Sequence, residues 1–114
     1  MTTMQPVDPT HYTYRVTWSA EDDEFVAVCL ELPSLSWLAG TPQAALSGLE
    51  QVVSEVVIDM HEHGEQVPTP LAEQRFSGRF NLRVPETLHR RLAIEAAEHG
   101  VSLNRLVSDR LARS

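Results

Sequence analysis

The chain has 114 residues, 42% of them apolar, which suits one compact domain or two very small ones and excludes wholesale disorder. It has no run of 18 apolar residues and no charged leader followed by an apolar stretch, so we expect no membrane span, no signal peptide and a cytoplasmic location. The formal net charge is −7.

The charge is divided unevenly along the chain. Residues 1–74 hold 12 carboxylates and one Arg, a balance of −11, whereas residues 75–114 hold 8 Arg and 4 carboxylates, a balance of +4. There is no Lys. A switch of this size predicts two modules with different partners. The basic module suits nucleic acid, and the acidic module suits a basic protein.

The first half of the chain begins with strand patterns. Residues 1–11 carry prolines and small polar residues, and we expect a flexible leader there. Tyr12–Trp18 alternates between apolar and polar residues, which predicts a half-buried strand. Phe25–Leu30 is apolar on both faces and predicts a central strand covered on both sides. Leu35–Leu38 predicts a short third strand. Cys29, the only cysteine, is expected to be a buried, inert thiol.

A helix should follow these strands. Thr41 is a typical N-cap residue, Pro42 suits the first helical position, and Gly64 suits the left-handed position after the end at about His63. Three- and four-residue steps predict one buried stripe, formed by Leu46, Leu49, Val53, Val56 and Met60. Residues 65–70 allow one short edge strand, and residues 71–78 are expected to be a linker.

No pattern in the chain indicates catalysis or metal binding. The acidic run Glu21–Glu24 lacks the alternating ligands and the fixed Gly of a calcium loop, and it predicts a solvated hairpin turn. His61 and His63 are two apart on a helix, a spacing that does not bring both to one ion. A nucleophile elbow, a phosphate-cradling Gly loop and an HExxH motif are all missing from the sequence. We therefore expect a protein that is not an enzyme and uses no cofactor or metal.

The most informative stretch lies in the basic half. Residues 79–84 alternate, so a strand there would place its apolar side chains on one face and two arginines and an asparagine on the other. Arg pairs bidentately with guanine in the major groove, and Asn pairs with adenine. An ordinary surface strand with polar residues in water is the alternative interpretation.

The residues that follow predict two helices. Pro85 begins the first, with Leu88, Leu92 and Ala96 on one side, and Ser102 caps the second. A module of about 36 residues without a disulfide or metal is too small to bury a core alone. We expect it to dimerise by pairing its strand with the same strand of a second chain. The apolar face of that ribbon would form the dimer core, made of Phe80, Leu82 and Val84.

This module resembles the ribbon-helix-helix repressors. Arg79–Pro85 is similar to the strand of Arc repressor, and Gly100–Arg105 is similar to the family's inter-helix turn. The resemblance spans residues 79–114. It implies that three side chains read DNA bases: Arg79, Asn81 and Arg83. It also implies that backbone N–H groups at the start of the second helix hold phosphate, at Ser102, Leu103, Asn104 and Arg105.

The first module resembles the HicB antitoxins. The similarity lies in the hairpin after Tyr14, the turn Leu32–Leu35, the helix start Gly40–Leu46 and the closing Pro68–Pro70. It implies an α+β protein with a partial ribonuclease-H-like β-β-β-α-β domain at residues 12–70, followed by the ribbon-helix-helix domain at 79–114. The partners it implies are a HicA-like basic, mRNA-cleaving toxin and operator DNA, bound by a homodimer that could pair into a tetramer.

The toxin contacts are placed from charge alone, at the acidic turn: Glu21, Asp22, Asp23 and Glu24. Two other functions stay open at this point. One is a ligand-responsive ribbon-helix-helix regulator whose first module senses a small molecule, with Trp18 and Trp37 lining the pocket. The other is an enzyme tethered to DNA, for which a nuclease assay with a divalent metal is the test.

Overall fold

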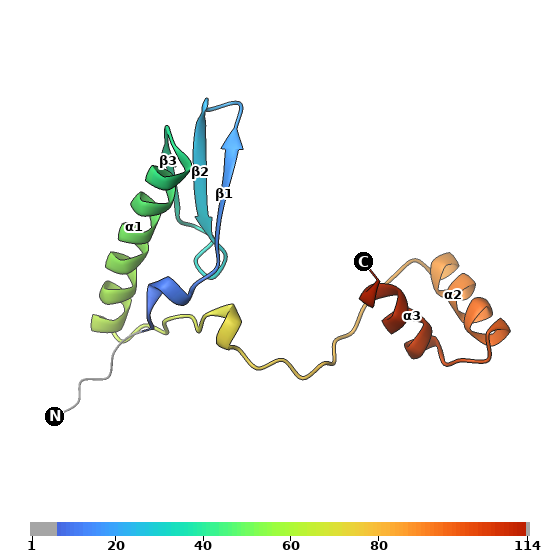
Figure 1. The fold of residues 1–114 in the computed structure, drawn as a ribbon. Helices are drawn as coiled ribbons and strands as arrows, with labels where there is room; N and C mark the ends of the chain where they lie inside the picture. Colours follow the sequence, from blue (N-terminus) through green and yellow to red (C-terminus); the bar gives the residue numbers. More distant parts are fainter. Residues whose placement is uncertain (1–6, 114) are drawn as a thin grey trace. The chain divides into compact units, whose positions relative to one another are not determined.

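The computed structural model describes residues 7–113, which fall into two compact units, Met1–Phe76 and Ser77–Ser114 (Figure 1). They are called unit 1 and unit 2 below, and each is described by itself. The chain is an α+β protein with one three-stranded antiparallel sheet and three α-helices in its described part. Within residues 7–113, no helix combines the length and the apolar character that crossing a bilayer requires.

The sheet of unit 1 contains β1 (Tyr14–Ser19), β2 (Glu24–Cys29) and β3 (Ser36–Ala39), with β2 in the centre. The predicted hairpin is confirmed, because β1 and β2 pair antiparallel with Val16 opposite Ala27. On its other side β2 pairs antiparallel with β3, where Trp37 lies opposite Ala27. Residues directly opposite one another project to the same side, so Val16, Ala27 and Trp37 share one face, called the inner face below.

The turn between β1 and β2 is held by its own side chains. Ser19 Oγ donates to Asp22 Oδ2 over 2.8 Å, and the Asp22 backbone N–H donates back to Ser19 Oγ over 3.3 Å. Asp23 has a φ of 54°, in the left-handed region. Asp tolerates this region better than most residues, because its short polar side chain can bond locally. The acidic run therefore forms a hairpin turn, as predicted.

Helix α1 (Pro42–Glu62) packs along the inner face of the sheet (Figure 1). Both predicted helix ends are confirmed. Thr41 Oγ1 accepts a hydrogen bond from the Ala44 N–H over 3.1 Å, which satisfies one of the free donors of the first turn. Gly64 follows the helix with a φ of 70°, a conformation that glycine adopts without strain.

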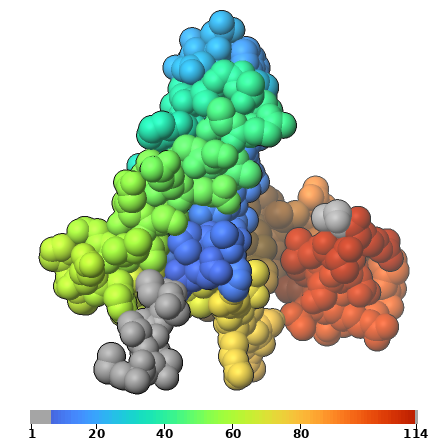
Figure 2. All heavy atoms as spheres, turned by 60° about the vertical axis from the view of Figure 1, so that its left-hand side comes forward, coloured from blue at the N-terminus to red at the C-terminus, as the bar shows by residue number. Residues whose placement is uncertain are grey.

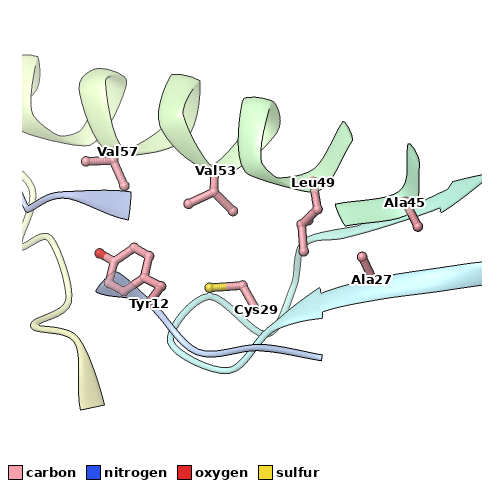
Figure 3. Close-up of a cluster of buried hydrophobic side chains, with 7 residues drawn as sticks. All are labelled: Tyr12, Ala27, Cys29, Ala45, Leu49, Val53 and Val57. Carbon is pink, nitrogen blue, oxygen red and sulfur yellow. The ribbon is translucent and has the colours of Figure 1, made fainter. Parts of the chain in front are cut away.

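The buried line of α1 agrees with the predicted stripe in its middle and differs at its ends. Leu49 and Val53 are buried as expected. Leu46, Val56 and Met60 are only half-buried, and Ala45 and Val57 are buried instead. Apolar residues flank this line on both sides, so periodicity alone did not fix its end positions. Figure 3 shows the line facing the rest of the core: Tyr12, Ala27 and Cys29.

The opposite face of the sheet, called the outer face below, is uncovered within the described residues of unit 1. The prediction that β2 is covered on both sides is therefore wrong. Alternation turns Val26 and Val28 away from α1, and both are only half-buried. Leu38 lies opposite Val26 on β3 and is 38% exposed. In the apolar run of β2, alternate residues therefore face the core, and the residues between them lie on a partly exposed surface.

Residues 7–11 correct the prediction of a flexible leader, whereas residues 1–6 lie outside the described part. The 3₁₀ helix η1 (Pro9–His11) forms there, and the Asp8 side chain caps it by accepting from the Thr10 N–H over 2.9 Å. The Tyr14 hydroxyl donates to the Pro9 carbonyl over 2.8 Å. Val7 packs against the hydrophobic core. This segment is therefore part of the folded unit.

The segment after α1 also departs from the prediction. Residues 65–70 form no strand, so the expected fourth strand is wrong. Pro68 and Pro70 lack the N–H that a sheet ladder needs, and the Pro68 carbonyl instead accepts from the Tyr12 hydroxyl over 2.7 Å. The 3₁₀ helix η2 (Leu71–Glu73) follows inside the range expected to be a linker. We call Val67–Gln74 the strap.

Unit 2 contains two helices, α2 (Glu86–Glu98) and α3 (Leu103–Ala112). The predicted cap is confirmed, because Ser102 Oγ accepts from the Arg105 N–H over 3.0 Å. The helices are joined by an ion pair between Arg110 and Glu95. Ala96 is the single buried residue that unit 2 has among its described residues. As a lone chain, this unit has hardly any core.

Candidate functional sites

The segment of the predicted DNA-reading strand has no regular structure in the single chain. Residues 79–84 pair with no other described segment; Phe80 and Leu82 are exposed to solvent and Val84 is half-buried. Phe80 is 76% exposed and Leu82 is 63% exposed. Aromatic and aliphatic side chains at this level of exposure have gained only a minor part of the free energy that burial provides. These side chains are available for another surface.

The apolar side chains of this segment and of both helices line one hollow of unit 2. Its volume is about 680 Å³. Phe80, Leu82 and Val84, the predicted dimer core, all line it. The helices contribute four further apolar residues to it, namely Leu92, Leu103, Val107 and Leu111. The structure therefore places the predicted dimer-core residues around one hollow whose lining is mostly apolar.

The three predicted base-reading residues are all exposed, but only one of them lines the hollow. Arg79 is one of the residues that line the hollow, whereas Asn81 and Arg83 are not. The Arg79 backbone N–H donates to Ser77 Oγ over 3.1 Å, so a local turn sets the start of the segment. Neither Arg79 nor Arg83 forms an ion pair within the described residues, which leaves both guanidiniums with unused donors.

The start of α3 presents free backbone donors at the place predicted to hold phosphate. The cap uses the Arg105 N–H, because it donates to Ser102 Oγ. The Leu103 and Asn104 N–H groups precede it in the first turn, where a helix has no internal acceptors to offer. Of the four predicted phosphate-holding residues, these two supply the donors best suited to an anion.

The acidic turn presents four carboxylates without a cation. Glu21, Asp22 and Asp23 are exposed and Glu24 is half-buried. Within residues 7–113 none of them forms a salt bridge. Next to the turn, Trp18 is 52% exposed and meets Phe25 edge to face, with ring centroids 5.0 Å apart. The turn is thus a strongly negative tip beside an accessible aromatic ring.

The two tryptophans lie at the inner-face edges of the sheet. Trp37 is 43% exposed and packs against α1 at Gly48, where a built Cβ would stand 2.0 Å from the indole Nε1. Trp18 packs against Phe25. Both rings therefore have a structural role, while a large part of each stays accessible.

Sequence reasoning missed Glu31, which accepts more hydrogen bonds than any other side chain in residues 7–76. The Glu31 carboxylate accepts from the Thr13 N–H over 2.9 Å, from Thr13 Oγ1 over 3.0 Å and from the Leu71 N–H over 2.9 Å. It therefore joins the start of β1 to the strap. Desolvation opposes its ionisation, but the hydrogen bonds from Leu71 and Thr13 outweigh that effect and lower the pKa of Glu31.

A second contact fastens the strap from the N-terminal side. His11 Nδ1 lies 2.5 Å from Glu73 Oε2, and His11 Nε2 lies 3.6 Å from Asp8 Oδ2. The Tyr12 hydroxyl bonds to the Pro68 carbonyl, and burial raises the pKa of Tyr12 to about 12. The strap is far in sequence from the residues that hold it, namely Glu31, His11 and Tyr12. No local sequence motif therefore predicts these contacts.

Cys29 is buried, as predicted, and burial raises the pKa of its thiol. A protonated, buried thiol is a poor nucleophile. Among residues 7–113, no three His, Cys, Asp or Glu side chains gather closely enough to hold a metal ion.

These features define a two-unit α+β protein with an acidic unit built on a sheet and a basic unit with an open apolar hollow. Comparison with known proteins adds one finding. The model of the HicB family matches residues 62–111, from the last residue of α1 into α3. No curated protein and no solved structure matches the chain.

Proposed function

We propose that this protein is the antitoxin of a HicAB-type toxin–antitoxin system, neutralising a HicA-like toxin with unit 1 and repressing its own operon with unit 2. The observation that carries the proposal is the match of the HicB family model to residues 62–111. The charge division supports it independently, because an acidic unit and a basic unit suit a basic protein and a nucleic acid respectively.

Unit 2 is proposed to be a ribbon-helix-helix domain that exists as a dimer. A chain of 38 residues (Ser77–Ser114) is below the size at which an unstapled core usually suffices. In the dimer, residues 79–84 of two chains pair as an antiparallel ribbon. Phe80, Leu82 and Val84 then leave solvent, and the second chain covers the hollow that they line. The exposure of Phe80 and Leu82 supports this arrangement.

The dimer is proposed to bind operator DNA through the other face of the ribbon. Arg79, Asn81 and Arg83 would lie in the major groove, which accepts a two-stranded ribbon. The Leu103 and Asn104 N–H groups would donate hydrogen bonds to DNA phosphates, because they point outward at the start of α3, where the helix dipole favours negative charge. Residues 75–114 hold 8 Arg, so binding should weaken steeply with salt as phosphate counterions are released.

Unit 1 is proposed to be a partial ribonuclease-H-like domain that binds the toxin. Its β-β-β-α order supports this, although the strap stands where a further strand was expected. The acidic turn Glu21–Glu24 is the proposed first point of attraction for a basic protein. Reversing those charges should slow association more than it speeds dissociation, because charge steers the encounter.

Growth rescue tests the proposal. The chain is co-expressed with the product of the short, basic reading frame beside its own gene. We expect that product alone to arrest growth and the pair to restore it. Continued arrest despite abundant soluble chain, or the lack of any such neighbouring frame, would contradict the proposed function.

A further inference from the structure

The outer face of the sheet carries an aliphatic stripe that nothing in the described part of unit 1 covers (Figure 1). Strand alternation places Val26 and Val28 on it, with Leu30 directly after β2 and Leu38 beside Val26 on β3. Leu30 is 43% exposed and Leu38 is 38% exposed. The other face of the same sheet is closed by α1, so this stripe is not needed for the core.

The stripe has acidic side chains at one end and a single basic side chain beside it. Glu24 is the outer-face residue at the hairpin end of β2, so the stripe runs directly into the acidic turn (Figure 2 shows the hairpin end of unit 1 in light blue). On β1, Arg15 stands opposite Val28 and is exposed. Arg15 is the one basic side chain of fixed charge in residues 1–74, and it forms no salt bridge within the described residues.

We propose that this outer face is where the basic partner protein docks, with Leu30 and Leu38 as apolar anchors, the acidic turn as its attractive end, and a carboxylate of the partner on Arg15. The proposal rests on the proposed function and names the surface that function uses. An apolar centre with a charged rim is the usual anatomy of a protein interface. The acidic turn alone would supply attraction but little buried area.

Charge favours a basic partner over a second copy of this chain. Residues 1–74 have a balance of −11, so two such units facing each other repel. Residues 1–74 of a second copy would also offer only one guanidinium, that of Arg15, against four turn carboxylates. A basic protein meets the turn with opposite charge, and only its contact at Arg15 needs an acidic group. Binding through this face should therefore weaken with added salt, whereas self-association through it should strengthen.

The experiment uses the full chain and the product of the neighbouring basic reading frame, with binding followed by calorimetry. Leu30→Glu and Leu38→Glu place a charge in the stripe. Ile58→Glu is the matched control, because Ile58 is 51% exposed and lies on α1, which covers the other side of the sheet. Circular dichroism checks that each variant folds. If Leu38→Glu does not fold, Leu38→Ser replaces it as a milder change.

We expect the stripe variants to weaken the complex by at least about tenfold, the loss typical of a central interface residue, and Ile58→Glu to leave it unchanged. Arg15→Glu should weaken it as well. Folded stripe variants that bind like the unchanged protein would overturn this docking surface while leaving the proposed function standing. No complex with the unchanged protein would overturn the proposed function, and this surface with it.

One further outcome would show that a second copy of this chain, and not the basic partner, binds the outer face. If the unchanged chain forms a larger oligomer by light scattering, and Leu38→Glu dissolves that oligomer without affecting partner binding, the outer face joins copies of this chain and the proposal is wrong.

Discussion

Replacing Glu31 by Gln should loosen the strap from unit 1. The carboxylate offers two acceptor oxygens: Oε1 lies 2.9 Å from the Thr13 nitrogen, and Oε2 lies 2.9 Å from the Leu71 nitrogen. An amide keeps one oxygen and turns an NH₂ group toward the other donor. Either orientation therefore leaves at least one of these two N–H groups facing a donor. The shape of the side chain is otherwise unchanged.

The size of the effect follows from the bonds that are lost. A hydrogen bond to a charged group contributes about 1.5–3 kcal/mol, and the partial exposure of Glu31 reduces that figure by solvent screening. We expect the free energy of unfolding of unit 1 to fall by about 1–2 kcal/mol, which lowers Tm by roughly 5–10 °C for a unit of this size. Thermal unfolding followed by circular dichroism measures the change.

The pH dependence gives an independent check. The pKa of Glu31 in the folded state is lowered from the ordinary value of 4.5, so its contribution to stability is complete above that value and is lost as pH falls through the folded pKa. The Gln variant should lack this part of the acid sensitivity, and the two proteins should converge in stability at low pH. An unchanged Tm at neutral pH, together with an unchanged acid slope, would refute the assigned role of Glu31.

Three other predictions concern the turn, the helix and the ribbon. Asp23→Gly should stabilise unit 1 by up to about 1 kcal/mol in a denaturant titration, because it relieves a φ of 54°. Gly48→Ala should destabilise by about 1–2 kcal/mol because its Cβ displaces Trp37, and the sign should reverse in a Trp37→Ala background, where only helix propensity remains. Arg83→Ala should cost about 1–3 kcal/mol of operator affinity at one base pair, so a uniform loss over all sequences would make Arg83 a phosphate contact.

Local chemistry made several elements predictable. The N-caps at Thr41 and Ser102 were predicted because a capping hydroxyl acts within three residues along the chain. The hairpin was predictable because two alternating segments flank a short polar run. The glycine after α1 was predictable from the left-handed conformation that helix ends favour. In each of these cases the cause and the effect lie within a few residues.

The features that sequence reasoning missed depend on contacts between distant residues. Glu31 is 40 positions from Leu71, and His11 is 62 positions from Glu73, so nothing local distinguishes either from a solvated side chain. The same contacts hold η1 and η2 in place, where a leader and a linker were expected. Which residues end the buried line of α1 also depends on the sheet beneath the helix, because apolar residues occupy both sides of that line.

The candidate sites also include one feature that the sequence predicted and one that it did not. Alternation predicted that Phe80, Leu82 and Val84 lie on one side, and the structure places all three around one hollow. Their role as a dimer core stays a prediction. The uncovered outer face was not predictable, since an apolar run such as Phe25–Leu30 has the same sequence pattern whether one face or both faces are covered. The pairing of residues 79–84 with a second chain stays a prediction.

Inhibition of RNA cleavage tests the central proposal most directly. The product of the neighbouring basic reading frame is assayed on an mRNA substrate while the full chain is added in increasing amounts. The antitoxin function predicts that cleavage stops when the chain reaches about one equivalent, and that Asn81→Ala, a change in the proposed DNA-reading face, inhibits equally well. Cleavage that continues at full rate in excess folded chain would contradict the function proposed here.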